Sequence, residues 1–201
     1  MLTVAPDNKL CKVSTTGNTM LKGCVLSMTP SEEYNTALAS LTKLQTWLLN
    51  NGLSGYDPYD IKGHSVYHRA LHKTIPFHRQ TRRILDIGDR YAPQFTRSVF
   101  KIKPAFNAKG LGLLALGYLR LYQHFKNNFY LKQCESILLK LEEIRVRGLK
   151  GYGWGYPFDW DSVQFFPAGT PSIVVSCIVG KAFWEHFKIT GSVQSKSTAQ
   201  S

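Results

Sequence analysis

The sequence has few cysteines and none of the spacings that give cysteine a recognisable role. Its four cysteines form no C-x-x-C pair and no zinc-finger pattern, which argues against a redox motif or a structural zinc site of that type. The first 28 residues lack a continuous apolar core after their first charges, so no secretion signal is expected. Without secretion a disulfide framework is not expected, and we interpret the cysteines as free thiols.

Long apolar runs are also missing. The most apolar windows, Gly110–Leu119 and Ser172–Val179, are much shorter than the roughly 20 residues that a membrane-spanning helix needs. We therefore expect no membrane span and a cytoplasmic location.

Acidic residues are scarce: 13 Asp and Glu stand against 25 Lys and Arg, for a net charge of +12. The excess is concentrated in residues 62–103, where ten basic residues accompany only Asp86 and Asp89. A positive field attracts nucleic acid, an anionic membrane surface or an anionic substrate. This stretch lacks the interleaved aromatic stacking platforms and the RNP-like pattern of single-strand RNA binders, and it has no convincing helix-turn-helix, which argues against nucleic acid. We expect a basic, solvated helical face.

What the chain does have is helical periodicity and enough length for one domain with a core, at 201 residues and 43% hydrophobic content. The fold class expected is all-α, built from antiparallel helical hairpins with long loops rich in glycine and aromatic residues. Caps and stops place five helices at about 29–51, 77–91, 108–126, 129–144 and 173–187. We expect an irregular segment over 1–28, a helical domain over 29–191 and a disordered polar tail over 192–201.

Two loops concentrate polar and aromatic residues, Gly55–Gly63 and Gly151–Pro171. Sugars present flat apolar faces ringed by hydroxyl groups, so a carbohydrate site needs aromatic platforms beside carboxylates. A pair of carboxylates that flanks a glycosidic bond can also hydrolyse it. The candidate catalytic residues are Asp57, Asp60, Asp159 and Asp161, and the candidate substrate-binding residues are Tyr56, Tyr59, Tyr152, Trp154, Tyr156 and Trp160. The alternative is that the aspartates stabilise turns and helix ends while the aromatic residues plug the end of a helical barrel.

Three histidines, His64, His68 and His72, are spaced by four residues, with Asp60 one step earlier. On one continuous helix they would share a face, and imidazoles at that spacing can bind zinc. No H-E-x-x-H pattern is present, and the neighbouring basic residues oppose a cation. We expect a partly exposed polar face and no metal, and zinc uptake would favour the alternative.

A dinucleotide-like pattern, G-x-G-x-x-A, runs from Gly110 to Ala115, with Glu135 20 residues further on. The segment before it contains Pro104, and the segment after it continues one amphipathic helix, so the strand and the βαβ unit that the motif needs are missing. We interpret Gly110, Gly112 and Gly117 as sites of close helix packing and expect no cofactor.

Three segments together resemble the six-hairpin glycosidase-like, (α/α)-toroid proteins: YDPYD at 56–60, NAKGLGLLALGYLRLY at 107–122 and GYGWGYPFDWDS…FFPAGTPSIVV at 151–175. The similarity is greatest to a bacterial group that occurs with polysaccharide and surface-glycan assembly genes, and it covers residues 29–191. It implies a carbohydrate-sized cleft where the long loops gather, with Asp57, Asp60, Trp154, Tyr156, Asp159 and Trp160 as site positions. A complete toroid has six hairpins, whereas this chain offers about five helices, so the chain is part of a toroid, or a smaller helical domain, or a ring that a second chain closes. The uncovered apolar faces of an incomplete ring predict self-association.

Two functions therefore remain open. One is a carbohydrate-active or carbohydrate-binding protein of bacterial glycan biosynthesis or processing, with an anionic glycan favoured by the basic charge and paired carboxylates available for hydrolysis. The other is a non-catalytic helical interaction or scaffold module that uses the aromatic loop to bind a protein. Only the first accounts for both the carboxylates and the aromatic residues.

Overall fold

The computed structural model describes residues 30–148, 150–161 and 164–201, and within these ranges the chain is mostly helical. The all-α class is therefore confirmed. The predicted irregular segment over 1–28 and residue 29, where the first helix was predicted to begin, lie outside the described residues. The chain divides into two units, residues 1–46 and 47–201, and every residue of the candidate site belongs to the second unit.

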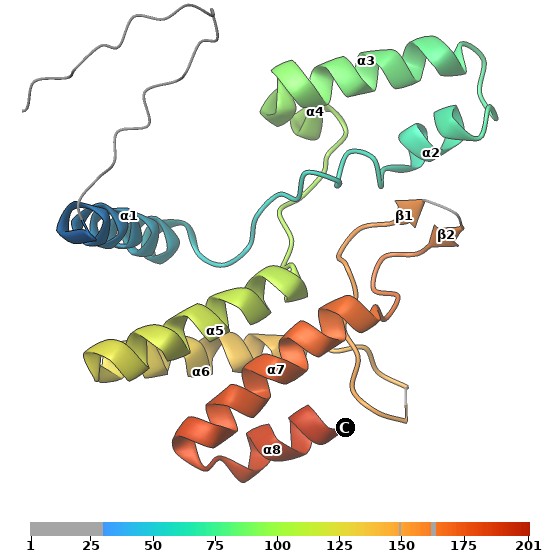
Figure 1. The fold of residues 1–201 in the computed structure, drawn as a ribbon. Helices are drawn as coiled ribbons and strands as arrows, with labels where there is room; N and C mark the ends of the chain where they lie inside the picture. The colour runs from blue at the N-terminus through green and yellow to red at the C-terminus, as the bar shows by residue number, and fades with distance from the viewer. Residues whose placement is uncertain (1–29, 149, 162–163) are drawn as a thin grey trace, which may run out of the picture. The chain divides into compact units, whose positions relative to one another are not determined.

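The described residues form eight helices and one short hairpin, with the order shown in Figure 1. The helices are α1 Pro30–Asn51, α2 Ser65–Leu71, α3 His78–Tyr91, α4 Pro93–Val99, α5 Ala108–Phe125, α6 Asn128–Glu143, α7 Ile173–Thr190 and α8 Val193–Gln200. The hairpin pairs β1, Trp160–Asp161, antiparallel with β2, Phe165–Phe166. Five helices lie where the periodicity predicted them, whereas α2 and α4 are too short to give a periodic signal.

The core of the second unit forms between α5, α6 and α7. Lys126 adopts the left-handed conformation after α5 and Asn127 at once caps α6, so the two helices form the expected antiparallel hairpin (Figure 1). α7 packs on α5 at Gly112, where a Cβ would come within 3.1 Å of the Ile178 side chain. Close packing thus explains Gly112 but not Gly117, which faces open space. The main core residues are Leu111, Ala115, Leu119, Cys134, Ile137, Leu141, Val175, Val179, Ala182 and Phe183.

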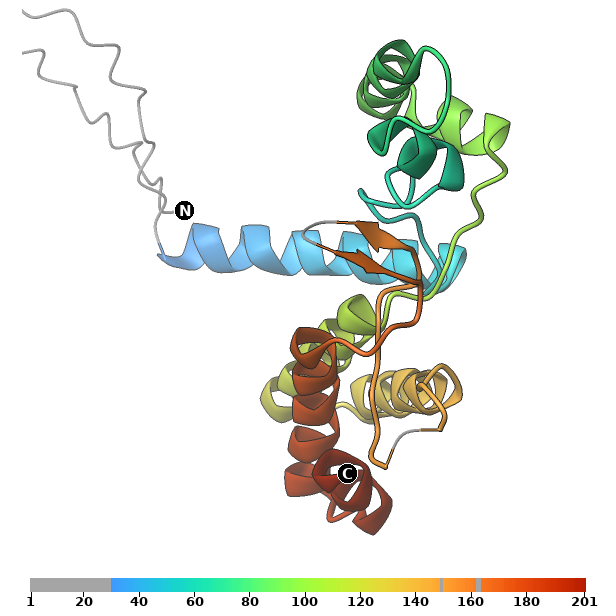
Figure 2. The same cartoon turned by 90° about the vertical axis from the view of Figure 1, so that its right-hand side faces the viewer.

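Helix α8 corrects the expectation of a disordered tail over residues 192–201. It folds back against α7 (Figures 1 and 2) and buries hydroxyl groups instead of an apolar stripe. Thr198 Oγ1 donates to Glu142 Oε1 at 2.6 Å, and Ser195 Oγ lies 2.8 Å from His186 Nδ1. The sequence of this segment is polar because the side chains that it buries are hydroxyl groups held by hydrogen bonds.

Helix α7 has Ser172 as its N-cap, and the preceding Pro171 pairs with Gly155 in an isolated bridge. In α3 only Leu85 is fully buried, while Ile84 and Tyr91 are exposed. None of the helices that the structure describes combines the length and the apolar character needed to cross a bilayer.

Candidate functional site

The two loops predicted to carry the site lie against each other. A Cβ on Gly63 would stand 2.7 Å from the backbone oxygen of Asp159, so the first loop approaches the second closely enough to require glycine. A two-bond bridge between Gly55 and Ala105 holds the start of the first loop, with N–O distances of 3.0 and 2.9 Å. Segments about 100 residues apart in sequence therefore form one local structure.

A cavity of about 430 Å³ opens between these loops and the start of α5. Asp57 and Asp60 from the first loop and Asp159 from the second all line it. This volume lies within the range of small-molecule sites in proteins. The other polar or aromatic lining residues are Tyr56, His64, Lys103, Asn107 and Phe158.

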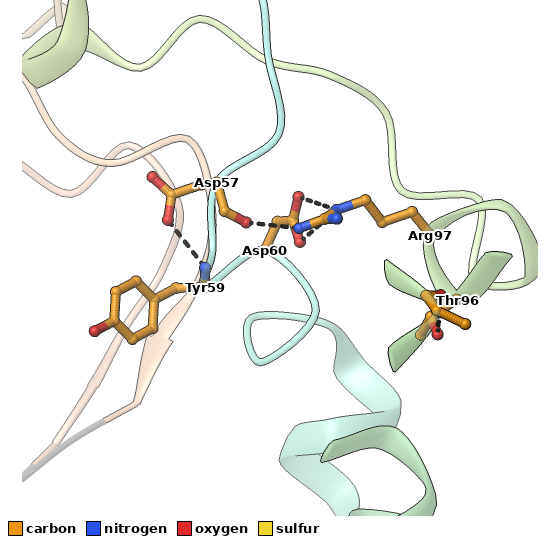
Figure 3. A network of polar contacts seen from close by, with 6 residues as sticks. Asp57, Tyr59, Asp60, Thr96 and Arg97 are labelled. Atoms are coloured by element: carbon orange, nitrogen blue, oxygen red, sulfur yellow. Dashed lines mark hydrogen bonds and ion pairs between the residues drawn. The ribbon is translucent and has the colours of Figure 1, made fainter. Parts of the chain in front are cut away.

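Asp60 is held by a buried ion pair with Arg97 of α4 (Figure 3). Arg97 Nε donates to both carboxylate oxygens at 3.0 and 3.2 Å, and Arg97 Nη2 donates to the Asp57 carbonyl at 3.2 Å. The guanidinium group also lies over the Tyr56 ring, 4.9 Å from its centre. These contacts fix the loop because a buried carboxylate and guanidinium group stabilise each other's charge.

Asp57 connects the loop to α5. Its Oδ1 accepts from the Tyr59 backbone N–H at 3.0 Å, and its Oδ2 accepts from Asn107 Nδ2 at 2.7 Å. Asn107 in turn caps α5 by accepting from the backbone N–H groups of Lys109 and Gly110. Asp57 therefore orients Asn107, the N-cap of α5. This matches the alternative prediction from the sequence, in which the aspartates stabilise turns and helix ends.

Asp159 is the least engaged of the three cavity carboxylates. Its Oδ1 accepts from the Ala168 backbone N–H at 2.7 Å. Its other oxygen accepts no hydrogen bond from any residue within the ranges that the structure describes. Asp159 is half-buried and lines the cavity, so of the three carboxylates it has the most capacity left to accept a hydrogen bond from a ligand.

Asp161 lies apart from the other three predicted carboxylates. It does not line the cavity but contacts two histidines of the α2 segment, His68 and His72. His64 is separated from these histidines because it caps α2, where its Nδ1 accepts from the Val66 N–H at 3.3 Å. Burial lowers the pKa of His64, which favours a neutral ring at the cavity wall.

Trp154, predicted to contact substrate, is a core residue. Its side chain is 2% exposed, its Nε1 donates to the Leu141 carbonyl at 2.7 Å, and its ring stacks on Phe183. Tyr152 is exposed and packs beneath Arg145, outside the cavity lining. Neither side chain can serve as a platform in this cavity.

The other aromatic candidates divide between two places. Tyr56 lines the cavity itself. Tyr59, Tyr156 and Trp160 form a cluster in which Trp160 meets Tyr59 edge to face at 5.1 Å and stacks with Tyr156 at 6.2 Å. Tyr156 and Trp160 also line a second hollow, of about 370 Å³, beside Pro171 and Ile173.

Sequence reasoning missed three residues that build the site: Arg97, Lys103 and Asn107. Asn107 has a signal, because an asparagine before an amphipathic helix is a typical N-cap. Arg97 was hidden within the basic stretch, and its burial is revealed only by its partner Asp60, 37 residues away.

Comparison of the chain with protein-family models, curated proteins and solved structures finds no match in any of the three.

Proposed function

We propose that this protein binds a carbohydrate in the cavity between its two loops, as its resemblance to the toroid glycosidases implies. The observation that carries the proposal is the meeting of Asp57, Asp60 and Asp159 beside Tyr56 in one cavity of about 430 Å³. Fixed carboxylates accept hydrogen bonds from sugar hydroxyl groups, and an aromatic ring covers an apolar sugar face. The cavity is large enough for a small saccharide.

The charge of the lining favours a neutral glycan over the anionic one expected from the whole sequence. Three carboxylates line the cavity, Arg97 neutralises only Asp60, and Lys103 is the lysine in the lining. Much of the basic charge lies elsewhere, on exposed residues of α3 that include Arg79, Arg82 and Arg83. An anionic sugar would meet unfavourable charge close to its binding groups.

Binding is better supported than hydrolysis. A glycosidase needs one carboxyl group as acid and a second as base or nucleophile. Asp60 is ion-paired with Arg97, and both oxygens of Asp57 already accept hydrogen bonds. Of the three cavity carboxylates, only Asp159 keeps an oxygen without a partner among the residues that the structure describes, so we propose ligand binding as the primary function.

The test is a glycan-array screen of the purified chain, with Asp159→Asn as the variant and Asp89→Asn as the matched control. Asp89 belongs to α3 and does not line the cavity. We expect neutral glycans to be retained and Asp159→Asn to weaken binding about tenfold or more, because a charged hydrogen bond contributes roughly 1.5–3 kcal/mol. Asp89→Asn should bind like the unchanged chain. Retention of no glycan, or equal loss in both variants, would refute the proposal.

An interaction module is the second candidate, because α3 and α4 expose several large apolar side chains. Ile84, Ile87, Tyr91, Phe95 and Val99 are all at least half exposed. Exposed apolar side chains in one region are typical of protein contact surfaces. The same screen separates the candidates, since an interaction module retains no glycan in any variant.

A further inference from the structure

His68, His72 and Asp161 form a compact group outside the proposed glycan cavity. His72 Nε2 lies 2.5 Å and His68 Nδ1 lies 3.3 Å from the same oxygen, Asp161 Oδ2. One potential ligand atom from each residue lies within 4.8 Å of the other two. The group joins α2 to β1, two elements about 90 residues apart in sequence.

The local structure explains why these residues meet. His68 lies within α2 and His72 caps its C-terminal end, so the spacing of four places both rings on one side of the helix. Asp161 is the last residue of β1, and the adjacent strand contributes Phe165, whose ring meets His68 edge to face at 4.9 Å. The hairpin thereby presents Asp161 to the two imidazole rings.

Burial gives the group a closed side and an open side. The side chains of Asp161 and His68 are 9% and 13% exposed, whereas His72 is 57% exposed. His68 Nε2 is buried and has no hydrogen-bond partner among the residues that the structure describes. The other ring nitrogen, Nδ1, is the one that faces Asp161, and the exposed side at His72 gives access to a small ion and to water.

The donors and their spacing fit a divalent transition metal. Two imidazole nitrogens and one carboxylate oxygen are a common zinc ligand set, with a further position left for water. Neighbouring ligand atoms on a tetrahedral zinc ion stand about 3.3 Å apart, from metal–ligand distances of about 2.0–2.1 Å. His68 and Asp161 already have this separation, and the exposed His72 has to move away from Asp161 Oδ2, from 2.5 Å to about 3.3 Å.

We propose that His68, His72 and Asp161 bind one divalent transition-metal ion, with zinc as the preferred ion. The sequence alone did not predict this site, because it grouped His64 with the other histidines and Asp161 with the other carboxylates. The bound ion fastens the β1–β2 hairpin to α2. Arg69 and Lys73 beside the site are exposed, so solvent screens their repulsion of the cation.

The first test uses the full chain, stripped with a chelator and dialysed. Titration with Zn²⁺, followed by calorimetry and elemental analysis, should show one equivalent bound per chain. Co²⁺ in place of zinc should give the visible absorption bands of a four- or five-coordinate site with nitrogen and oxygen ligands. Failure of the unchanged chain to retain zinc overturns the proposal without reference to any variant.

The second test compares His72→Ala and Asp161→Asn with the control His124→Ala. His72 and His124 are both exposed, so neither change disturbs a core, and His124 lies on α5 outside the group. Loss of one of three ligands should weaken zinc binding on the order of tenfold or more, whereas His124→Ala should bind normally. Equal binding by all three variants places the metal elsewhere and overturns the assignment.

Discussion

Trp154 illustrates at the scale of one residue how an aromatic side chain in a loop can belong to the core. Trp154 points into the core, where its indole N–H donates to the Leu141 carbonyl and its ring stacks on Phe183. Tyr156 and Trp160, from the same glycine-rich segment, line a hollow instead. The sequence shows aromatic residues in this loop, but it could not separate those that pack in the core from those that line a hollow, because both kinds are aromatic rings beside glycines.

Replacing Trp154 with alanine should therefore destabilise the fold. The change removes a fully buried ring and its hydrogen bond, so we expect the free energy of unfolding to fall by about 3–5 kcal/mol. Urea denaturation followed by circular dichroism measures this loss. Trp184→Ala on α7 is the matched control, and it should cost clearly less because Trp184 is exposed. Similar losses in both variants would contradict the core assignment.

The carboxylates show the same limit of residue-level prediction. The sequence predicted Asp57, Asp60 and Asp159 as residues of one site, and all three line one cavity. The partners were not predictable, because Arg97 and Asn107 reach their aspartates across 37 and 50 residues. Asp161 does not line this cavity, because the strand β1 places it against α2. A strand of two residues is too short to give a pattern in the sequence.

At the scale of elements, periodicity and caps predicted the long helices and missed the short or polar ones. α5, α6 and α7 have apolar stripes that form the core, and such stripes are visible in the sequence. α8 has none, since it is held by Ser195 and Thr198 through hydrogen bonds to His186 and Glu142. From sequence alone, a polar segment that is held by long-range hydrogen bonds cannot be distinguished from a disordered tail, because its partners lie far away in the chain.

The junction of α7 and α8 should make stability depend on pH. Burial lowers the pKa of His186 below its ordinary value of 6.5, although the nearby Glu135 carboxylate raises it in part. His186 therefore binds a proton more readily in the unfolded chain than in the folded chain. The free energy of unfolding should therefore fall as the pH is lowered through about 6.5 towards the pKa of the folded state.

His186→Asn tests this coupling, because asparagine cannot take up a proton in this range but can still form a hydrogen bond with Ser195. Thermal unfolding at about pH 7.5 and pH 5.5 should show a smaller loss in the variant than in the unchanged chain. Some loss should remain, since burial lowers the pKa of His64 in the same direction. An identical loss in both proteins would show that His186 does not contribute.

At the scale of the whole molecule, the central claim is that two distant loops act as one binding surface. The resemblance that motivated this claim also implied a toroid, which remains a proposal. The contact between the loops does not depend on that resemblance. It is formed by residues within 47–201, where Gly63 packs against Asp159 and Arg97 pairs with Asp60. Two separate loops would each offer a small surface, whereas two loops in contact offer one larger surface to a ligand.

Hydrogen–deuterium exchange with a glycan retained on the array tests this claim most directly. We expect the glycan to slow backbone exchange in both loops, over residues 55–63 and 155–161, and to leave α3 unchanged. The effect should disappear in Asp159→Asn and persist in Asp89→Asn. Protection confined to one loop, or protection of α3 with both loops unchanged, would contradict the account.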